Sequence, residues 1–278
     1  MKFPLGYIGV GLMGGPMVKR LTSLGWQVKA YDIVPERSTV ATVADAVRGA
    51  DVVLLNLPTN EAVEDALAKL LPVLRAPQLV VDFSTIPVDA CRRHAARLKK
   101  AGCRWVDAPV SGGPPAVAAG TLTVMAGGEA EDIERIVPLM RDIAGRCTRM
   151  GPVGSGLAAK MINQLIVGVG HAMLGEAVAL CERAGIDAAR IPECLGGGYA
   201  DSNLMKAYWP RMVERDFAPR GYARQLLKDL EMVNAWAEAL GSRTPMLGAA
   251  LAAYRQLKAA GLSELDTSAV VKLYLKKQ

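Results

Sequence analysis

Hydrophobic and polar positions follow two different patterns along the 278-residue chain. Up to about residue 150, short apolar runs alternate with segments of helical periodicity, which predicts a mostly parallel, doubly wound sheet with crossover helices. The predicted strands span residues 5–10, 27–31, 52–57, 79–83, 104–106, 121–126 and 147–150. The predicted helices between them span residues 13–24, 61–74, 88–101 and 130–143.

From Gly156 onward the strand pattern is absent and long helical patterns follow one another. These patterns span residues 156–184, 187–195, 203–214, 219–240, 244–260 and 266–276. We therefore predict an α/β domain over residues 1–155 and an all-helical domain over residues 156–278. The first long helix of the second domain is expected to join the two domains.

A glycine-rich turn follows the first predicted strand and opens the first predicted helix. Its sequence, GVGLMG at residues 9–14, fits G-x-G-x-x-G, a motif that is weak alone but much stronger between a strand and a helix. The first glycine permits a tight turn, the second lets a pyrophosphate approach the backbone, and the third lets the helix pack closely on the sheet. The motif thus predicts a Rossmann domain that binds a dinucleotide through Gly9, Gly11, Leu12, Met13 and Gly14.

The second predicted strand ends in Tyr31 and Asp32. A carboxylate at this position accepts hydrogen bonds from the adenosine ribose hydroxyls and repels a 2′-phosphate, so Asp32 favours NAD as the cofactor. Arg37 lies close by in the sequence and is able to pair with a 2′-phosphate, so NADP stays open as the alternative.

Composition narrows the functional classes further. The net charge of +6 is mild and aromatic residues make up only 5%, whereas nucleic-acid binding calls for a dense basic stripe with aromatic platforms. The five cysteines are scattered without a C-x-x-C pair and there are only two histidines, which predicts reduced thiols and no metal site. Without a signal-peptide pattern or an apolar run long enough to span a membrane, we expect a cytoplasmic protein with no membrane partner.

One lysine stands in an apolar, glycine-rich part of the long helical segment, which reads GLAAKMINQLIVGVG at residues 156–170. Burial of an ammonium is unfavourable unless it is paired or neutralised. Asn163 and Gln164 follow Lys160 at helical positions i+3 and i+4, so the three side chains share one face. The pattern alone allows either a solvated polar stripe or a small polar site.

Several motifs occur in a specific order along the chain. DFSTIP at residues 82–87 is followed by DAPVSGG at 107–113, by GTLT at 120–123, and by GSG at 154–156 just before Lys160. Together with the opening glycines, this order resembles the β-hydroxyacid dehydrogenase family, which includes 3-hydroxyisobutyrate dehydrogenase and tartronate semialdehyde reductase. The resemblance covers nearly the whole chain, and it implies the same fold, a Rossmann domain followed by a helical domain.

The resemblance also implies roles for individual residues. Lys160 matches the family's catalytic lysine, which takes a proton from the substrate hydroxyl in oxidation and returns one to the carbonyl in reduction. Burial and a neighbouring cationic nicotinamide both favour the neutral amine that this role requires. The residues implied to bind the substrate, including its carboxylate, are Ser111, Gly112, Gly113, Asn163 and Gln164. The further residues implied at the cofactor are Leu57, Pro58, Thr85 and Lys228.

The substrate is expected to be a small 3-hydroxy acid or its semialdehyde. The pair Asn163–Gln164 and the segment GGGYADS at residues 196–202 look most like the tartronate semialdehyde reductase branch. The alternatives are 3-hydroxyisobutyrate, glyoxylate and succinic semialdehyde, or a catalytically silent scaffold that binds a dinucleotide. Related 6-phosphogluconate dehydrogenases carry histidine and glutamate where this chain has Asn163 and Val167, so we expect no decarboxylation. Imine reductases share the fold but usually replace the lysine, so Lys160 argues against that activity.

Two further expectations concern assembly and the adenosine side of the cofactor. The resemblance, together with apolar stretches such as residues 245–253, implies a homodimer or homotetramer. Residues 35–50 are too few for the helix and strand that the family normally has there. We expect only a stub, with residues 38–43 as the strand, reached by a loop. Because this segment flanks the adenosine site, it bears directly on the choice between NAD and NADP.

Overall fold

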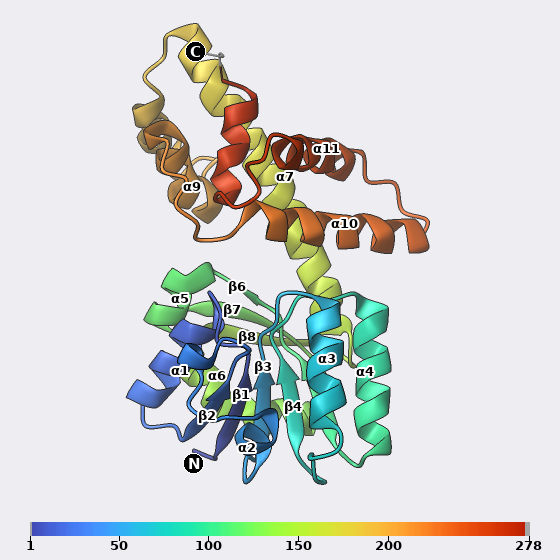
Figure 1. Ribbon diagram of the computed structural model, residues 1–278. Coiled ribbons are helices and arrows are strands. Elements are labelled where there is room, and N and C mark those ends of the chain that lie inside the picture. The colour runs from blue at the N-terminus through green and yellow to red at the C-terminus, as the bar shows by residue number, and fades with distance from the viewer. Residues whose placement is uncertain (1, 276–278) are drawn as a thin grey trace. The chain divides into compact units, whose positions relative to one another are not determined.

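The computed structural model describes residues 2–275 and divides into two compact units, one up to Lys160 and one from Met161 (Figure 1). The first unit is built on one eight-stranded sheet with the strand order β2-β1-β3-β4-β5-β7-β6, and β8 pairs with β7. Strands β1 to β5 are mutually parallel, and β7 runs antiparallel to β5 and β6. The strands are β1 Leu5–Ile8, β2 Val28–Tyr31, β3 Val52–Leu55, β4 Leu79–Asp82, β5 Arg104–Asp107, β6 Val110–Ser111, β7 Leu122–Gly127 and β8 Ala144–Gly151.

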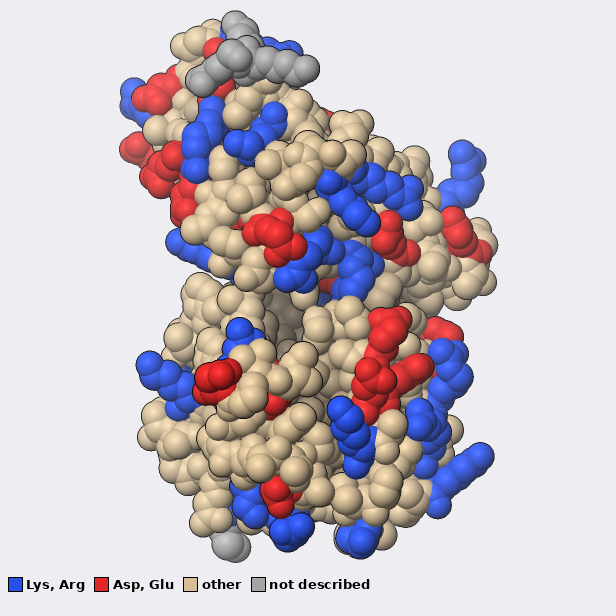
Figure 2. Space-filling view, in the orientation of Figure 1, with Lys and Arg blue, Asp and Glu red and all other residues tan. Residues whose placement is uncertain are grey.

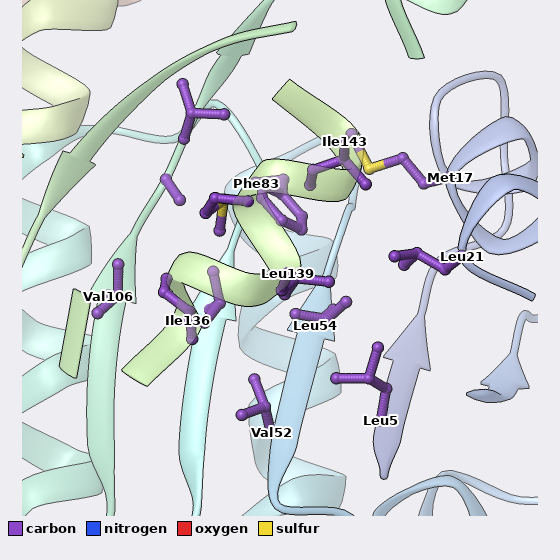
Figure 3. Close-up of a cluster of buried hydrophobic side chains, with 14 of the residues drawn as sticks. Leu5, Met17, Leu21, Val52, Leu54, Phe83, Val106, Ile136, Leu139 and Ile143 are labelled. Atoms are coloured by element: carbon purple, nitrogen blue, oxygen red, sulfur yellow. The ribbon is translucent and has the colours of Figure 1, made fainter. Parts of the chain in front are cut away.

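Helices cover both faces of this sheet. On one face, α1, α5 and α6 enclose a core of alternate strand residues, and Figure 3 shows Ile136, Leu139 and Ile143 of α6 beside the strand side chains. These α6 residues recur every three to four positions, which directs them to one side of the helix. On the opposite face lie α2, α3 and α4 (Figure 1). The helices are α1 Gly14–Ser23, α2 Val43–Val47, α3 Asn60–Leu70, α4 Val88–Lys100, α5 Gly113–Ala119 and α6 Ala130–Ile143.

Three short elements, β6, α2 and α5, were not predicted, because a two-residue strand and helices of five and seven residues carry no measurable periodicity. The expected strand at residues 38–43 was wrong. A 3-10 turn, η1 (Pro35–Arg37), leads into an irregular stretch before α2. Ala30 N donates to Thr39 Oγ1 and Asp32 N donates to Ser38 Oγ, each at 2.8 Å. Two side-chain hydroxyls thus occupy the edge of β2 where a neighbouring strand would otherwise pair.

The second unit is helical, as predicted. It contains most of α7 (Ser155–Ala184), and the glycines of that helix mark close helix packing. A Cβ on Gly168 would lie 2.4 Å from a methyl of Leu230, and one on Gly170 would lie 2.4 Å from Leu204. The last predicted helix is a 3-10 helix, and its expected end at residue 276 lies outside the described residues. The elements are η2 Ala188–Arg190, α8 Ile191–Leu195, α9 Asn203–Glu214, α10 Ala223–Ala239, α11 Pro245–Ala259 and η3 Thr267–Leu273.

Helix α7 corrects one expectation about apolar runs. An 18-residue window of this helix has a mean hydropathy of 1.5, so by length and composition alone it is able to cross a membrane. In the structure 56% of that window is buried, and the core helix of a soluble protein passes the same test.

The surface charge is mixed. On the face drawn in Figure 2, Lys and Arg side chains are interspersed with Asp and Glu side chains.

Candidate active site

The carboxyl ends of the parallel strands bring the predicted cofactor residues to one edge of the sheet. Gly9 follows β1, Asp32 follows β2, Leu57 and Pro58 follow β3, and Thr85 follows β4. Strand β1 lies between β2 and β3, so the chain reverses its direction of winding there. In open α/β sheets, ligands bind in the crevice outside the strand ends at such a switch point.

The glycine-rich turn has the geometry of a phosphate cradle. Gly9 has a φ of +97°, and a Cβ there would lie 2.3 Å from the Asn56 carbonyl oxygen. A Cβ on Gly14 would lie 1.9 Å from the Gly9 carbonyl oxygen, whereas one on Gly11 would meet no atom within 4 Å. Met13 makes no side-chain capping bond at the start of α1, and Leu12 is exposed. These residues therefore fit a dinucleotide, whose pyrophosphate would lie against the turn and the helix N-terminus.

Asp32 has a second role that sequence reasoning did not reveal. Its Oδ2 accepts from Val10 N at 2.6 Å and its Oδ1 accepts from Val34 N at 2.9 Å. The carboxylate therefore ties the glycine-rich turn to the loop after β2. Beside it lies a hollow of about 340 Å³ lined by Tyr31, Asp32, Ile33, Pro35, Ser38, Thr39, Val40 and Ala41. Arg37 is exposed and does not line this hollow.

A buried serine links the loops that follow β3 and β4. Ser84 Oγ accepts from Leu57 N at 2.8 Å, and Ser84 N donates to Asp82 Oδ1 at 2.9 Å. Thr85, next along the chain, is half-buried and Pro58 is exposed. Ser84 was missed in the sequence because a serine after a strand also fits an ordinary turn.

Lys160 is buried, with 7% of its surface exposed. Its Nζ donates to the Val110 carbonyl oxygen at 2.8 Å, so the structure does not support a solvated stripe at this position. The carbonyl belongs to β6, directly before Ser111, and the lysine head is thereby brought to the predicted carboxylate loop. Gly112 and Gly113 follow with φ values of +126° and +68°, a backbone conformation that explains two glycines in succession.

The second unit connects the predicted amides to an aspartate. Asn163 Nδ2 donates to Gln164 Oε1 at 2.7 Å, and Gln164 Nε2 donates to Asp229 Oδ2 at 2.6 Å. Lys228 Nζ lies 3.1 Å from the other oxygen of the same carboxylate. Asp229 is buried and was not predicted, because a lysine–aspartate pair on a helix has no distinctive pattern. The four residues form one polar chain in which Gln164 is oriented from both sides.

Comparison with known proteins matches both units. The family model described as the NAD binding domain of 6-phosphogluconate dehydrogenase matches residues 4–151. The model described as the NAD-binding of NADP-dependent 3-hydroxyisobutyrate dehydrogenase matches residues 154–274. The chain is 34% identical over 289 residues to the NAD-dependent L-serine dehydrogenase of Pseudomonas aeruginosa, covering 97% of each protein.

Two further relatives are similar to this chain over nearly its whole length. The 2-hydroxy-3-oxopropionate reductase of Escherichia coli is 31% identical over 278 residues, covering 96% of this chain and 95% of the relative. The solved structure of the Mycobacterium tuberculosis 3-hydroxyisobutyrate dehydrogenase with L-serine is 30% identical, with a TM-score of 0.88 and coverage of 98% and 99%.

The chain belongs to the β-hydroxyacid dehydrogenase family. This dehydrogenase is an NAD(P)-dependent oxidoreductase that acts on a CH–OH donor, as the sequence motifs predicted, and its substrate is a small molecule. Its Rossmann unit and helical unit correspond to the fold of the family. Among residues 2–275, no group of three or more His, Cys, Asp or Glu side chains is placed to hold a metal ion.

Proposed function

We propose that the dehydrogenase interconverts a small 3-hydroxy acid and its semialdehyde without releasing carbon dioxide. The observation that carries this proposal is the buried Lys160, whose Nζ lies 2.8 Å from the Val110 carbonyl oxygen beside the Ser111–Gly113 loop. A buried amine next to an anion-binding loop suits a substrate with a carboxylate at one end and a reacting oxygen at the other.

Each of the site residues has a separate role in the proposed reaction. In oxidation, Lys160 as a neutral amine accepts the proton of the C3 hydroxyl, and in reduction its ammonium donates a proton to the forming alkoxide. The Ser111 hydroxyl and the neighbouring backbone N–H groups hold the substrate carboxylate. Asn163 and Gln164 orient the reacting end of the substrate, and Gln164 is itself held by its hydrogen bond to Asp229. The bound nicotinamide accepts or supplies the hydride.

Loss of carbon dioxide would require a second proton donor near the lysine. The two helical positions where 6-phosphogluconate dehydrogenases carry such groups hold Asn163 and Val167 here. The Asn163 amide donates to Gln164, and the Val167 carbonyl accepts from His171 Nδ1 at 2.8 Å. Neither residue is an acid, which supports a simple oxidation or reduction.

The leading substrate is 2-hydroxy-3-oxopropionate, with L-serine as a second compound to test. One relative is named for each of these compounds. Both carry a carboxylate, a polar group on C2 and an oxygen on C3, whereas 3-hydroxyisobutyrate has a methyl group on C2. A site with Asn163 and Gln164 at the reacting end favours a substrate with a polar C2 group over one with a methyl group, because side-chain amides form hydrogen bonds with hydroxyl and ammonium groups.

For the cofactor, we propose a preference for NAD over NADP. The Asp32 carboxylate is held in place by Val10 N and Val34 N, and a 2′-phosphate beside it would meet a fixed negative charge. Arg37 lies outside the lining of the adjacent hollow. Asp32→Ser is expected to shift the NAD/NADP ratio of kcat/KM toward NADP by at least about tenfold, measured with both cofactors. An unchanged ratio would contradict the assignment.

For assembly, we propose a homodimer or homotetramer in the cytoplasm. In the expected apolar stretch at residues 245–253, Leu247, Ala250, Leu251 and Ala253 are buried, whereas Met246 is exposed. A second exposed apolar row lies on α7 at heptad-like spacing, and such a row on a helix is typical of an interface. Its large members are Ile162, Ile166, Met173 and Leu180.

The catalytic proposal is tested with Lys160→Met, which keeps the length of the side chain but not the amine. Turnover would be followed at the reduced-nicotinamide absorbance with 2-hydroxy-3-oxopropionate, L-serine, 3-hydroxyisobutyrate, glyoxylate and succinic semialdehyde. The variant should lose about a hundredfold or more of kcat while its dinucleotide affinity stays within about twofold. The exposed Lys99→Met on α4 serves as the matched control. Full turnover by Lys160→Met would refute the assignment.

A further inference from the structure

Asp107 is a fully buried carboxylate at the end of β5. Its Oδ1 accepts from Gly154 N at 2.7 Å, and its Oδ2 accepts from Leu157 N at 2.9 Å. Gly154 precedes the first residue of α7 and Leu157 lies in the first turn. The carboxylate therefore caps the helix that carries Lys160, from a position 47 residues earlier in the chain.

The surroundings of this carboxylate leave it little freedom. A Cβ on Gly127 would lie 2.6 Å from Asp107 Oδ1, and a Cβ on Gly156 would lie 2.9 Å from Oδ2. Two glycines thus allow β7 and α7 to close around the side chain. Burial raises the pKa of Asp107, and the N–H donors of Gly154, Leu157 and Gly156 oppose that change. A carboxylate at a helix N-terminus also interacts favourably with the helix dipole.

The same short segment also binds the side-chain amine of Lys160. Val110 lies three residues after Asp107, and its carbonyl oxygen accepts from Lys160 Nζ at 2.8 Å. Lys160 in turn lies three residues after Leu157, the second residue bound by Asp107. The segment from Asp107 to Val110 is therefore hydrogen-bonded to α7 at two places. One is the backbone at the start of the helix, and the other is the amine of Lys160.

We propose that Asp107 is a positioning residue for Lys160: by capping α7 it fixes the lysine amine relative to Ser111 and the substrate carbon. This inference rests on the proposed function of Lys160 as the acid/base. It assigns a mechanical role to the first residue of DAPVSGG, whose last three residues hold the substrate carboxylate. A displacement of about 1 Å at a reacting group is enough to lower a rate by about a hundredfold.

The test compares Asp107→Asn with Asp132→Asn in the full-length protein. Asparagine must turn an N–H₂ group toward one of the two N–H donors, so one of the two hydrogen bonds to α7 is lost and replaced by a donor–donor clash while the volume is kept. Asp132 is a buried aspartate in the first turn of α6, paired with Arg104 at 3.5 Å. The same substitution there controls for general destabilisation and is expected to leave activity unchanged.

Two measurements are made on each variant. In Asp107→Asn, kcat should fall about ten- to a hundredfold with dinucleotide affinity unchanged within about twofold. The labelling rate of Lys160 by an amine-reactive reagent, read by peptide mass spectrometry, should rise at least about fivefold, because a freed amine reaches solvent. Asp132→Asn should show neither change. Wild-type labelling in Asp107→Asn, a wild-type kcat in Asp107→Asn, or equal labelling increases in both variants would overturn the inference.

Failure of the proposed function gives a different signature. If Lys160→Met keeps full turnover, the lysine is not the acid/base, and the labelling comparison alone still decides whether Asp107 holds it. If Lys160→Met is inactive and Asp107→Asn turns over at the wild-type rate, the positioning role is wrong. Should Asp107→Asn not fold, Asp107→Ser, whose shorter side chain cannot bind both N–H groups and introduces no amide donor, is expected to show the same two changes.

Discussion

His171 should make the stability of the dehydrogenase depend on pH. It lies in the interior of α7 with 2% of its surface exposed. Its Nδ1 lies 2.8 Å from the Val167 carbonyl oxygen, which only accepts, so Nδ1 carries the proton. Its Nε2 therefore accepts from the Thr267 hydroxyl, 3.1 Å away. The neutral imidazole thus satisfies both contacts in the folded protein.

The magnitude follows from the pKa of this side chain. Burial lowers the pKa of His171 from 6.5 to about 4, against the opposing effects of the Val167 carbonyl and the Asp266 carboxylate. Above pH 6.5 the imidazole is neutral whether the chain is folded or unfolded. Between 6.5 and about 4 the unfolded chain takes up a proton that the folded chain does not, so stability falls as the pH falls. At ~1.4 kcal/mol per pH unit the full loss is about 3 kcal/mol, of which about 2 kcal/mol occurs between pH 7 and pH 5.

Urea unfolding of the wild type and of His171→Asn at pH 7 and pH 5 measures this effect. The difference in unfolding free energy between the two proteins should shrink by about 2 kcal/mol on acidification. Carboxylates and His94 are present in both proteins and cancel in the comparison. Because the chain has only two histidines, imidazole NMR signals give the titration directly. A constant difference, or a His171 signal that titrates near 6.5, would refute the reasoning.

Three other substitutions test separate parts of the structure. Gly14→Ala places a Cβ 1.9 Å from the Gly9 carbonyl oxygen, so dinucleotide affinity by calorimetry should fall at least about tenfold and the melting temperature should drop; wild-type affinity would argue against the cradle. Ser84→Ala removes the acceptor of Leu57 N and should weaken dinucleotide binding about three- to tenfold without changing kcat at saturation. Ile166→Glu, on the exposed row of α7, should shift sedimentation toward the monomer, and an unaltered assembly would exclude this row as the interface.

The predicted elements show where local patterns suffice. All strands of the sheet except β6, and the helices α1, α3, α4 and α6, were predicted to within a few residues, because periods of 2 and 3.6 are encoded in adjacent positions. Residues 38–43 were predicted wrongly, since their side chains suit a strand but their hydroxyls bond the edge of β2 instead. In the apolar stretch at residues 245–253, tertiary packing buries Leu247, Ala250, Leu251 and Ala253 and leaves Met246 exposed, a division that composition alone does not give.

By itself, the sequence determined the two-part architecture, the glycine-rich turn after β1, and the order of motifs that carries the family. Each of these depends on residues close together in the chain or on a fixed order along it. The tertiary structure decided how the candidate site is held. Asp107 caps α7 across 47 residues, and Asp229 orients Gln164 across 65. A hydrogen bond between distant residues leaves no local pattern, because the fold alone brings its donor and its acceptor together.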